Sequence, residues 1–156
     1  MNADPPPFLP RAALRLGFLG LIPLAVSALV TLSRDHDTSY FAAIAFSLYA
    51  AILLSFLGGV RCGIEIMRAP QSPNPRRLFF CALPGLAGWV LALFVVVSPM
   101  AAGVASAFAG IFAGQQVWDH RSAIDAGAPE WYPVLRQVLT GGAMIVCLIV
   151  PLASVL

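Results

Sequence analysis

The sequence predicts an all-α integral membrane protein, a bundle of five transmembrane helices. Three observations support this prediction. The 156-residue chain is 60% hydrophobic and only 10% charged, whereas a soluble domain carries about 25% charged residues. Five apolar stretches run along the chain, each close to the roughly 20 residues that a helix needs to cross a bilayer. Nearly all the arginines fall on alternate boundaries between these stretches. Since only helices satisfy the backbone across lipid in so short a chain, all five stretches are predicted to be α-helices.

The five predicted helices lie near residues 14–32, 40–63, 78–97, 100–118 and 133–156. Residues 1–11 contain three consecutive prolines and are expected to form a mobile, extended arm, so that residues 12–156 make up a single transmembrane domain. A cleaved signal peptide is the alternative for the first stretch, because Val26-Ser27-Ala28 resembles a cleavage site. The apolar run continues to Leu32, which favours a retained anchor.

Short polar or proline-containing segments separate the predicted helices. Residues 33–39 form a polar loop, and the prolines between 70 and 75 cannot continue a helix. Ser98-Pro99 is the one break between the third and fourth stretches, so we expect a tight hairpin there. One long kinked helix is the alternative, but about 40 apolar residues would overshoot a bilayer. The last loop runs from Asp119 to Glu130.

The arginines predict which side each loop faces. With five spans, the N-terminus and the second and fourth loops share one side. That side carries Arg11, Arg15, Arg61, Arg68, Arg76, Arg77, Arg121 and Arg136. The other side carries Arg34 alone, beside Asp35 and Asp37. Because positive loops stay inside, the N-terminus is predicted to be cytoplasmic and the C-terminus to face the opposite side. The expected location is a bacterial inner membrane, or the mitochondrial inner membrane if the protein is eukaryotic.

Small residues on the fourth stretch suggest how the bundle packs. Gly103, Ala107, Gly110 and Gly114 share one helix face, and small residues let membrane helices approach closely. We therefore expect the fourth helix to be the packing centre, with neighbours on more than one side. A dimerisation face at Gly110-x-x-x-Gly114 is the alternative.

Charged residues gather at the predicted cytoplasmic boundary. Arg61 and Glu65 are four residues apart, which predicts an ion pair on one helix face. Arg136 is expected to reach back to the headgroup interface or to pair with a carboxylate such as Glu65 or Asp119. The predicted polar cluster contains Arg61, Glu65, Asp119, His120, Arg121 and Arg136. Its functional interpretation is a site for an anionic group. The alternative is an interfacial anchor with local salt bridges, in which Trp131 and Tyr132 lie at the headgroup level.

Several function classes lack their sequence signatures. The chain shows no nucleophile with a base, no phosphate-binding loop and no dinucleotide fingerprint. Cys62, Cys81 and Cys147 lie far apart and form no metal-ligand spacing. We therefore expect a protein that is not an enzyme and has no metal or cofactor. The net charge of +2 gives no indication of a nucleic-acid partner. The expected partners are the lipid bilayer and other membrane-protein subunits or a second copy of the chain.

Two motifs and some isolated positions carry a resemblance to a known family. The motifs are Ser55-Phe56-Leu57-Gly58-Gly59-Val60-Arg61-x-Gly63 and Trp131-Tyr132-x-x-x-Arg136-x-x-x-Thr140, joined by Pro84 and the early segment from Leu16 to Pro23. Here the chain resembles the domain of unknown function 3429 family, which includes transmembrane protein 69 of animal mitochondria. Cys62 departs from the pattern, where Trp would be expected. The resemblance implies a small multi-helix inner-membrane protein and no established activity.

Two functions fit these observations. The leading hypothesis is a non-enzymatic accessory subunit or assembly factor of a membrane complex, acting through helix–helix contacts. The alternative is a small oligomeric transporter or channel component for an anionic or lipid-like solute, with Arg61, Arg121 and Arg136 supplying the charge. An enzyme acting on lipid ranks third.

Overall fold

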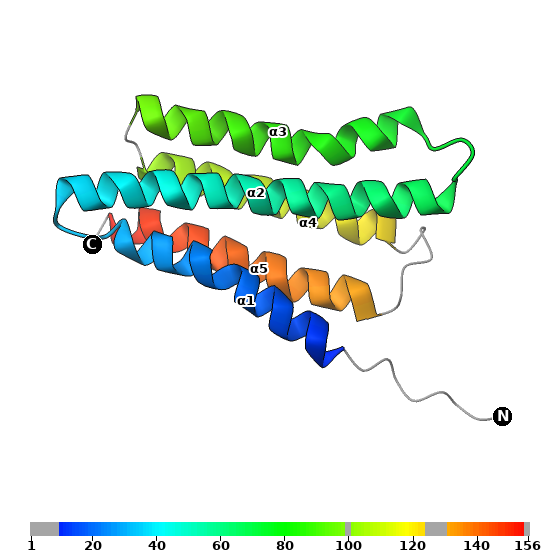
Figure 1. The fold of residues 1–156 in the computed structure, drawn as a ribbon, viewed down its shortest axis with the longest axis horizontal. Coiled ribbons are helices and arrows are strands. Elements are labelled where there is room, and N and C mark those ends of the chain that lie inside the picture. The colour runs from blue at the N-terminus through cyan, green and yellow to red at the C-terminus, as the bar shows by residue number, and fades with distance from the viewer. Residues whose placement is uncertain (1–9, 99–100, 124–130, 155–156) are drawn as a thin grey trace.

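The computed structural model of the protein describes residues 10–98, 101–123 and 131–154, with only the helix path for 120–123. Within these ranges the regular secondary structure is all helical (Figure 1), which confirms the predicted all-α fold class. The helices are α1 (Arg11–Val30), α2 (His36–Arg68), α3 (Pro75–Val97), α4 (Ala101–Ala123) and α5 (Trp131–Ala153). Most of the predicted arm, residues 1–9, lies outside the described residues, as does Pro99 of the predicted hairpin.

All five predicted helices are present, but several ends differ from the prediction. Helix α1 ends at Val30 rather than 32, and α5 begins at Trp131 rather than 133. Helix α4 continues past 118 to Ala123. Helix α1 ends before its apolar stretch does, whereas α4 and α5 extend beyond theirs. The reason is that the backbone hydrogen bonds of a helix need not end where the hydropathy of the sequence changes. The last two residues of the fifth predicted segment, 155–156, are not described.

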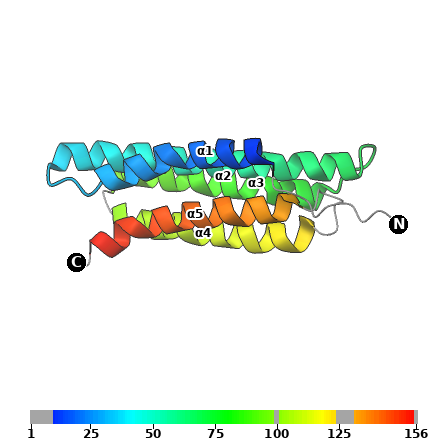
Figure 2. The ribbon, with the colours of Figure 1, turned by 90° about the horizontal axis from the view of Figure 1, so that it is seen from below.

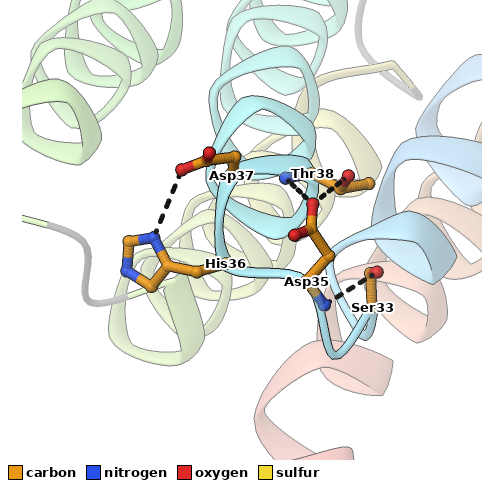
Figure 3. Close-up of polar contacts among 5 residues, drawn as sticks. All are labelled: Ser33, Asp35, His36, Asp37 and Thr38. Atoms are coloured by element: carbon orange, nitrogen blue, oxygen red, sulfur yellow. Dashed lines mark hydrogen bonds and ion pairs between the residues drawn. The ribbon is translucent and has the colours of Figure 1, made fainter.

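Capping residues explain the early starts of α2 and α3. Asp35 accepts a hydrogen bond from the backbone N–H of Thr38 at 2.9 Å, so α2 begins at His36 rather than 40 (Figure 3). Asn74 accepts one from the N–H of Arg76 at 3.0 Å, and Pro75 occupies the first helical position, where its missing N–H costs nothing. Both helices therefore begin in polar sequence that an apolar pattern does not include.

Helix α2 is much longer than a single span requires. Its 33 residues correspond to a length of about 50 Å, whereas the hydrocarbon core of a bilayer is about 30 Å thick. The predicted end at 63 is therefore wrong, since the helix continues through Glu65 to Arg68. The charged residues of α2 consequently lie on a rigid helix rather than in a loop.

The helices form two layers, and successive helices run antiparallel along a common axis (Figure 1 and Figure 2). Helices α1, α2 and α3 make one layer, and α4 and α5 make the other (Figure 2). The largest contacts are between α2 and α3 and between α4 and α5, while α1 packs on α5 and α2. We call the end where α2 and α4 finish and α1, α3 and α5 begin the arginine-rich end. The opposite end, which contains the turn between α1 and α2, is the loop end.

Four of the described helices, α1, α2, α3 and α5, are long and apolar enough to cross a membrane. Helix α4 is as long as α3 and α5 but is not among these four, because Gln115, Gln116 and Asp119 lower its apolar character. It lies alongside the others and packs against α5, α3 and α2. The chain is thus a multi-pass membrane protein whose least apolar helix lies among the others.

The closest helix packing is between α2 and α3. A Cβ atom added at Gly58 would lie 2.3 Å from the backbone carbonyl oxygen of Cys81. One added at Gly88 would lie 3.0 Å from the Cα of Ala51. Small residues on both helices therefore allow their backbones to approach, which is how membrane helices associate without a hydrophobic driving force.

The prediction for the glycine face of α4 is wrong. Gly103, Gly110 and Gly114 are exposed, and a Cβ atom added at any of them would have no described atom within 4 Å, while Ala107 is half-buried. The buried face instead carries Phe108 and Phe112, and Phe108 meets Phe46 of α2 edge to face. The spacing of the glycines placed them on one face but did not indicate its direction. The large rings fill the space between the layers, so the glycines face outward. Helix α4 does have neighbours on more than one side, as expected.

Candidate functional site

Six polar side chains are buried near the arginine-rich end of the bundle. They are Arg61, Glu65, Gln115, Asp119, Arg136 and Thr140. They come from α2, α4 and α5, so the three helices bring together residues that are up to about half the chain apart. Ionisable groups buried within a membrane protein are costly unless they find partners, and they commonly mark functional positions. These side chains are therefore the candidate site.

A buried ion pair connects α4 to α5. The Arg136 Nε donates to Asp119 Oδ2 at 2.7 Å, and a terminal nitrogen of the same guanidinium contacts that oxygen too. Both side chains are only 5% exposed. With its amide oxygen turned toward them, Gln115 accepts from Arg136 at 3.2 Å and from the backbone N–H of Gly58 at 3.3 Å. One connected set of polar contacts therefore joins α2, α4 and α5.

Glu65 pairs across the loop between α2 and α3. Its carboxylate lies 3.4 Å from Arg77, whose side chain is 39% exposed. The predicted Arg61–Glu65 pair is not formed. Two physical reasons account for this. An acidic residue four positions before a basic one pairs better on a helix than the reverse order found here. Glu65 also already pairs with Arg77 of α3, while Arg61 lines a crevice together with residues of α3 and α4.

Arg61 is the unusual member of the group. It is 5% exposed, and its Nη1 atom has no hydrogen-bond partner within the described part of the chain. It also forms no ion pair with a described carboxylate. The Oδ1 atom of Asp119 likewise has no partner there. A buried cation and a buried acceptor therefore remain unsatisfied close to each other.

Arg61 and Asp119 line a crevice with a volume of about 290 Å³. We call it the α2–α3–α4 crevice. Gly58 and Arg61 of α2 are buried members of its lining, and its walls are apolar residues of α3 and α4. These wall residues are Phe80, Leu83, Pro84, Ala87, Ile111 and Trp118. The rings of Phe80 and Trp118 lie 5.1 Å apart between centroids. The crevice thus has a polar inner end and a largely apolar lining.

The predicted cluster is brought together in part. Arg61 and Asp119 line the crevice and Arg136 pairs with Asp119, while Glu65 is occupied by Arg77. The side chains of the remaining two members, His120 and Arg121, lie outside the described residues.

The motif residues of the family resemblance fall into three groups. Gly58, Arg61 and Pro84 line the crevice, and Arg136 lies behind it in the ion pair. Ser55, Phe56, Gly59 and Gly63 lie instead on the exposed side of α2. Trp131 and Tyr132 are half-buried in the first turn of α5, with their rings 6.3 Å apart. The motifs therefore contribute to the crevice and also to the outer surface of α2.

Two members of the site, Gln115 and Thr140, and the partner of Glu65, Arg77, were not in the predicted polar cluster. Gln115 lies one turn before Asp119, and Thr140 lies one turn after Arg136, so helical spacing could have found both. Arg77 offers no such signal, because it meets Glu65 only after the chain reverses between α2 and α3. Among the described residues, no group of three His, Cys, Asp or Glu side chains is arranged to hold a metal ion.

Comparison with known proteins supplies a family and a relative. The family model described as "Protein of unknown function (DUF3429)" matches residues 9–153. Transmembrane protein 69 of Xenopus tropicalis is 32% identical over 135 residues, which are 84% of this chain and 50% of that protein. The chain therefore spans about half the length of this relative. No solved structure matches the chain.

Proposed function

The chain belongs to the DUF3429 family of proteins of unknown function, and from this premise we propose a role in assembling membrane complexes. The protein acts as a non-enzymatic accessory subunit or assembly factor in an inner membrane. It works through contacts between its helices and those of other membrane proteins.

The outward glycine face of α4 carries this proposal. Gly103, Gly110 and Gly114 are exposed, with open space beside each of them. Lipid does not drive helices together, so a partner helix gains most where small residues let the two backbones approach closely. The face is turned away from the protein's own core, which leaves it available to another chain.

The buried charges favour the same role. Arg136 and Asp119 are held in an ion pair between helices, and Glu65 is held by Arg77. A catalytic group needs a nucleophile or an acid–base pair directed at a substrate. The contacts observed here instead connect helices, which supports a structural role for these side chains.

A bulky residue on the glycine face tests the proposal. Gly110→Leu is expected to remove a co-purifying partner after gentle detergent extraction, because it blocks close approach at a position where an added Cβ atom meets no described neighbour. Gly59→Leu is the matched control, since Gly59 is also exposed and open but lies on α2. If the wild-type protein migrates only as a free monomer with nothing bound, the proposal is wrong.

One observation favours the second candidate, a transporter or channel component for an anionic or lipid-like solute. Arg61 places a buried cation beside the crevice. A single bundle of this size has little space for a continuous pathway, so such a function requires an oligomer. Solute flux in liposomes that disappears in Arg61→Ala would support this candidate, and flux unchanged by that substitution would contradict it.

A further inference from the structure

We propose that the α2–α3–α4 crevice binds one acidic phospholipid from the surrounding leaflet. The phosphate contacts Arg61, a headgroup hydroxyl reaches Asp119, and part of an acyl chain lies between α3 and α4. Gly114 belongs both to this crevice and to the glycine face of α4, but Arg61 and Asp119 lie outside that face, and the lipid site does not rest on the assembly role argued above.

The charges around the crevice require an anion. Arg61 and Arg136 contribute two positive charges, and Asp119, which is already bound to Arg136, contributes one negative charge. Glu65 and Arg77 neutralise each other. Among the side chains that the structure describes, one positive charge, that of Arg61, therefore remains uncompensated at a position 5% exposed. Burying an unpaired charge is strongly unfavourable, and a guanidinium matches the oxygens of a phosphate group.

The unpaired atoms of Arg61 and Asp119 indicate which hydrogen-bond donors and acceptors the lipid headgroup must provide. The Nη1 of Arg61 is a donor without an acceptor, and the Oδ1 of Asp119 is an acceptor without a donor, among the residues that the structure describes. A phosphodiester supplies the acceptor oxygens and the negative charge. A hydroxyl next to it, as on a glycerol headgroup, supplies the donor. A purely anionic group would leave Asp119 unsatisfied and repelled.

The walls indicate that the ligand is an amphiphile rather than a free anion. Phe80, Leu83, Pro84 and Ile111 present apolar surface along the crevice, and only its inner end is polar. Pockets for small molecules usually measure about 300–1,000 Å³. At about 290 Å³, this crevice holds the start of one acyl chain and the phosphate, with the rest of the lipid outside.

The crevice opens to the outer surface of the bundle, where a lipid can enter. Phe80, Leu83 and Trp118 line it and are themselves exposed, whereas Arg61 and Asp119 at its inner end are buried. The opening lies between α3 and α4. A lipid of the bilayer can therefore reach Arg61 sideways, without passing through the bundle.

Native mass spectrometry of the delipidated full-length protein tests the proposal. Phosphatidylglycerol is expected to bind in one copy, and about tenfold more tightly than phosphatidylcholine, because the extra positive charge selects an acidic lipid. Arg61→Gln should lose this preference, and Arg61→Lys should retain part of it. Inorganic phosphate should not compete at equal concentration. Effective competition by phosphate would overturn the lipid assignment in favour of a free-anion site.

A second pair of variants keeps the test valid if Arg61→Gln fails to fold. Gly114 lines the crevice, and a Cβ atom added there has no described atom within 4 Å, so the larger side chain of Gly114→Leu has room to fill the crevice and should abolish binding of both lipids. Gly103→Leu is the matched control, because Gly103 is equally open on the same helix but does not line the crevice. Phosphatidylglycerol binding that is unchanged in Gly114→Leu would overturn the proposal.

Discussion

The two ends of the bundle use the same kinds of polar residue in opposite ways. At the loop end, Asp35 and Asp37 contact only near neighbours in the sequence (Figure 3), and the His36–Asp37 pair is 87% and 91% exposed. At the arginine-rich end, Asp119 contacts Arg136 on another helix, and each is 5% exposed. Burial, rather than residue type, therefore separates a contact that shapes a turn from one that fixes helices together.

Removing a buried partner should have the largest effect. Arg136→Ala leaves the Asp119 carboxylate buried without its cation, and breaking such a pair typically costs about 3–5 kcal/mol. We expect a large fall in the thermal unfolding temperature in detergent. The matched control is Asp37→Ala at the loop end, where solvent screens the exposed pair and no measurable change is expected.

A double substitution sharpens this comparison. In Asp119→Leu with Arg136→Leu, neither charge is left buried, and apolar replacements of buried pairs are often neutral or stabilising. The double variant should therefore regain much of the stability that either single change loses. If it is as unstable as the single variants, the pair is needed for more than its mutual neutralisation.

The next largest loss of stability is expected from disturbing the close packing of α2 and α3 beside the buried charges. Gly58→Ala places a methyl group 2.3 Å from the Cys81 carbonyl oxygen, a backbone atom that cannot rotate away. Overpacking of this kind typically costs about 1–3 kcal/mol. Gly59→Ala is the control, because the neighbouring position is open. Equal unfolding temperatures for the two variants would show that α2 and α3 do not approach as closely as described.

Breaking the Glu65–Arg77 pair should cost less stability than breaking the Asp119–Arg136 pair and more than breaking the His36–Asp37 pair. Glu65 is buried, but Arg77 is 39% exposed, so water partly replaces the lost contact when Arg77 is removed. We expect Arg77→Ala to cost about 1 kcal/mol in thermal unfolding experiments. Arg76→Ala changes an exposed neighbour for comparison. If Arg77→Ala destabilises the protein as much as Arg136→Ala does, the partial exposure of Arg77 does not reduce the loss of stability.

The sequence predicted the helices well because their signals are local. Apolar runs and the arginine boundaries identify α1 to α5, and helical spacing places Asp119 and Arg136 near one end. The sequence named Glu65 and Asp119 as possible partners of Arg136, and the structure selects Asp119. To predict that Arg136 lies near these carboxylates, it was enough to know the order of the helices and the length of each one.

Two predictions failed. One concerned the direction of a helix face, and the other concerned which arginine pairs with Glu65. The glycines of α4 share a face by spacing, but which way that face points depends on Phe108 and Phe112 filling the interior. The spacing of Arg61 and Glu65 allowed a pair, yet Arg77 reaches Glu65 from the next helix. Both outcomes depend on three-dimensional neighbours, and one sequence contains no local sign of them.

The smallest expected effect is a pH dependence at the loop end. Hydrogen bonds from the hydroxyl and the backbone N–H of Thr38 favour the charged carboxylate and lower the pKa of Asp35. Because the folded pKa lies below the unfolded one, the stabilisation is fully present above the unfolded pKa and is lost as pH falls through the folded pKa. Asp35→Asn keeps a capping oxygen but cannot ionise. Its small deficit in unfolding temperature at neutral pH should therefore disappear in acid. A deficit that stays constant with pH would mean that the charge of Asp35 contributes nothing, and that the loop end is held by geometry alone.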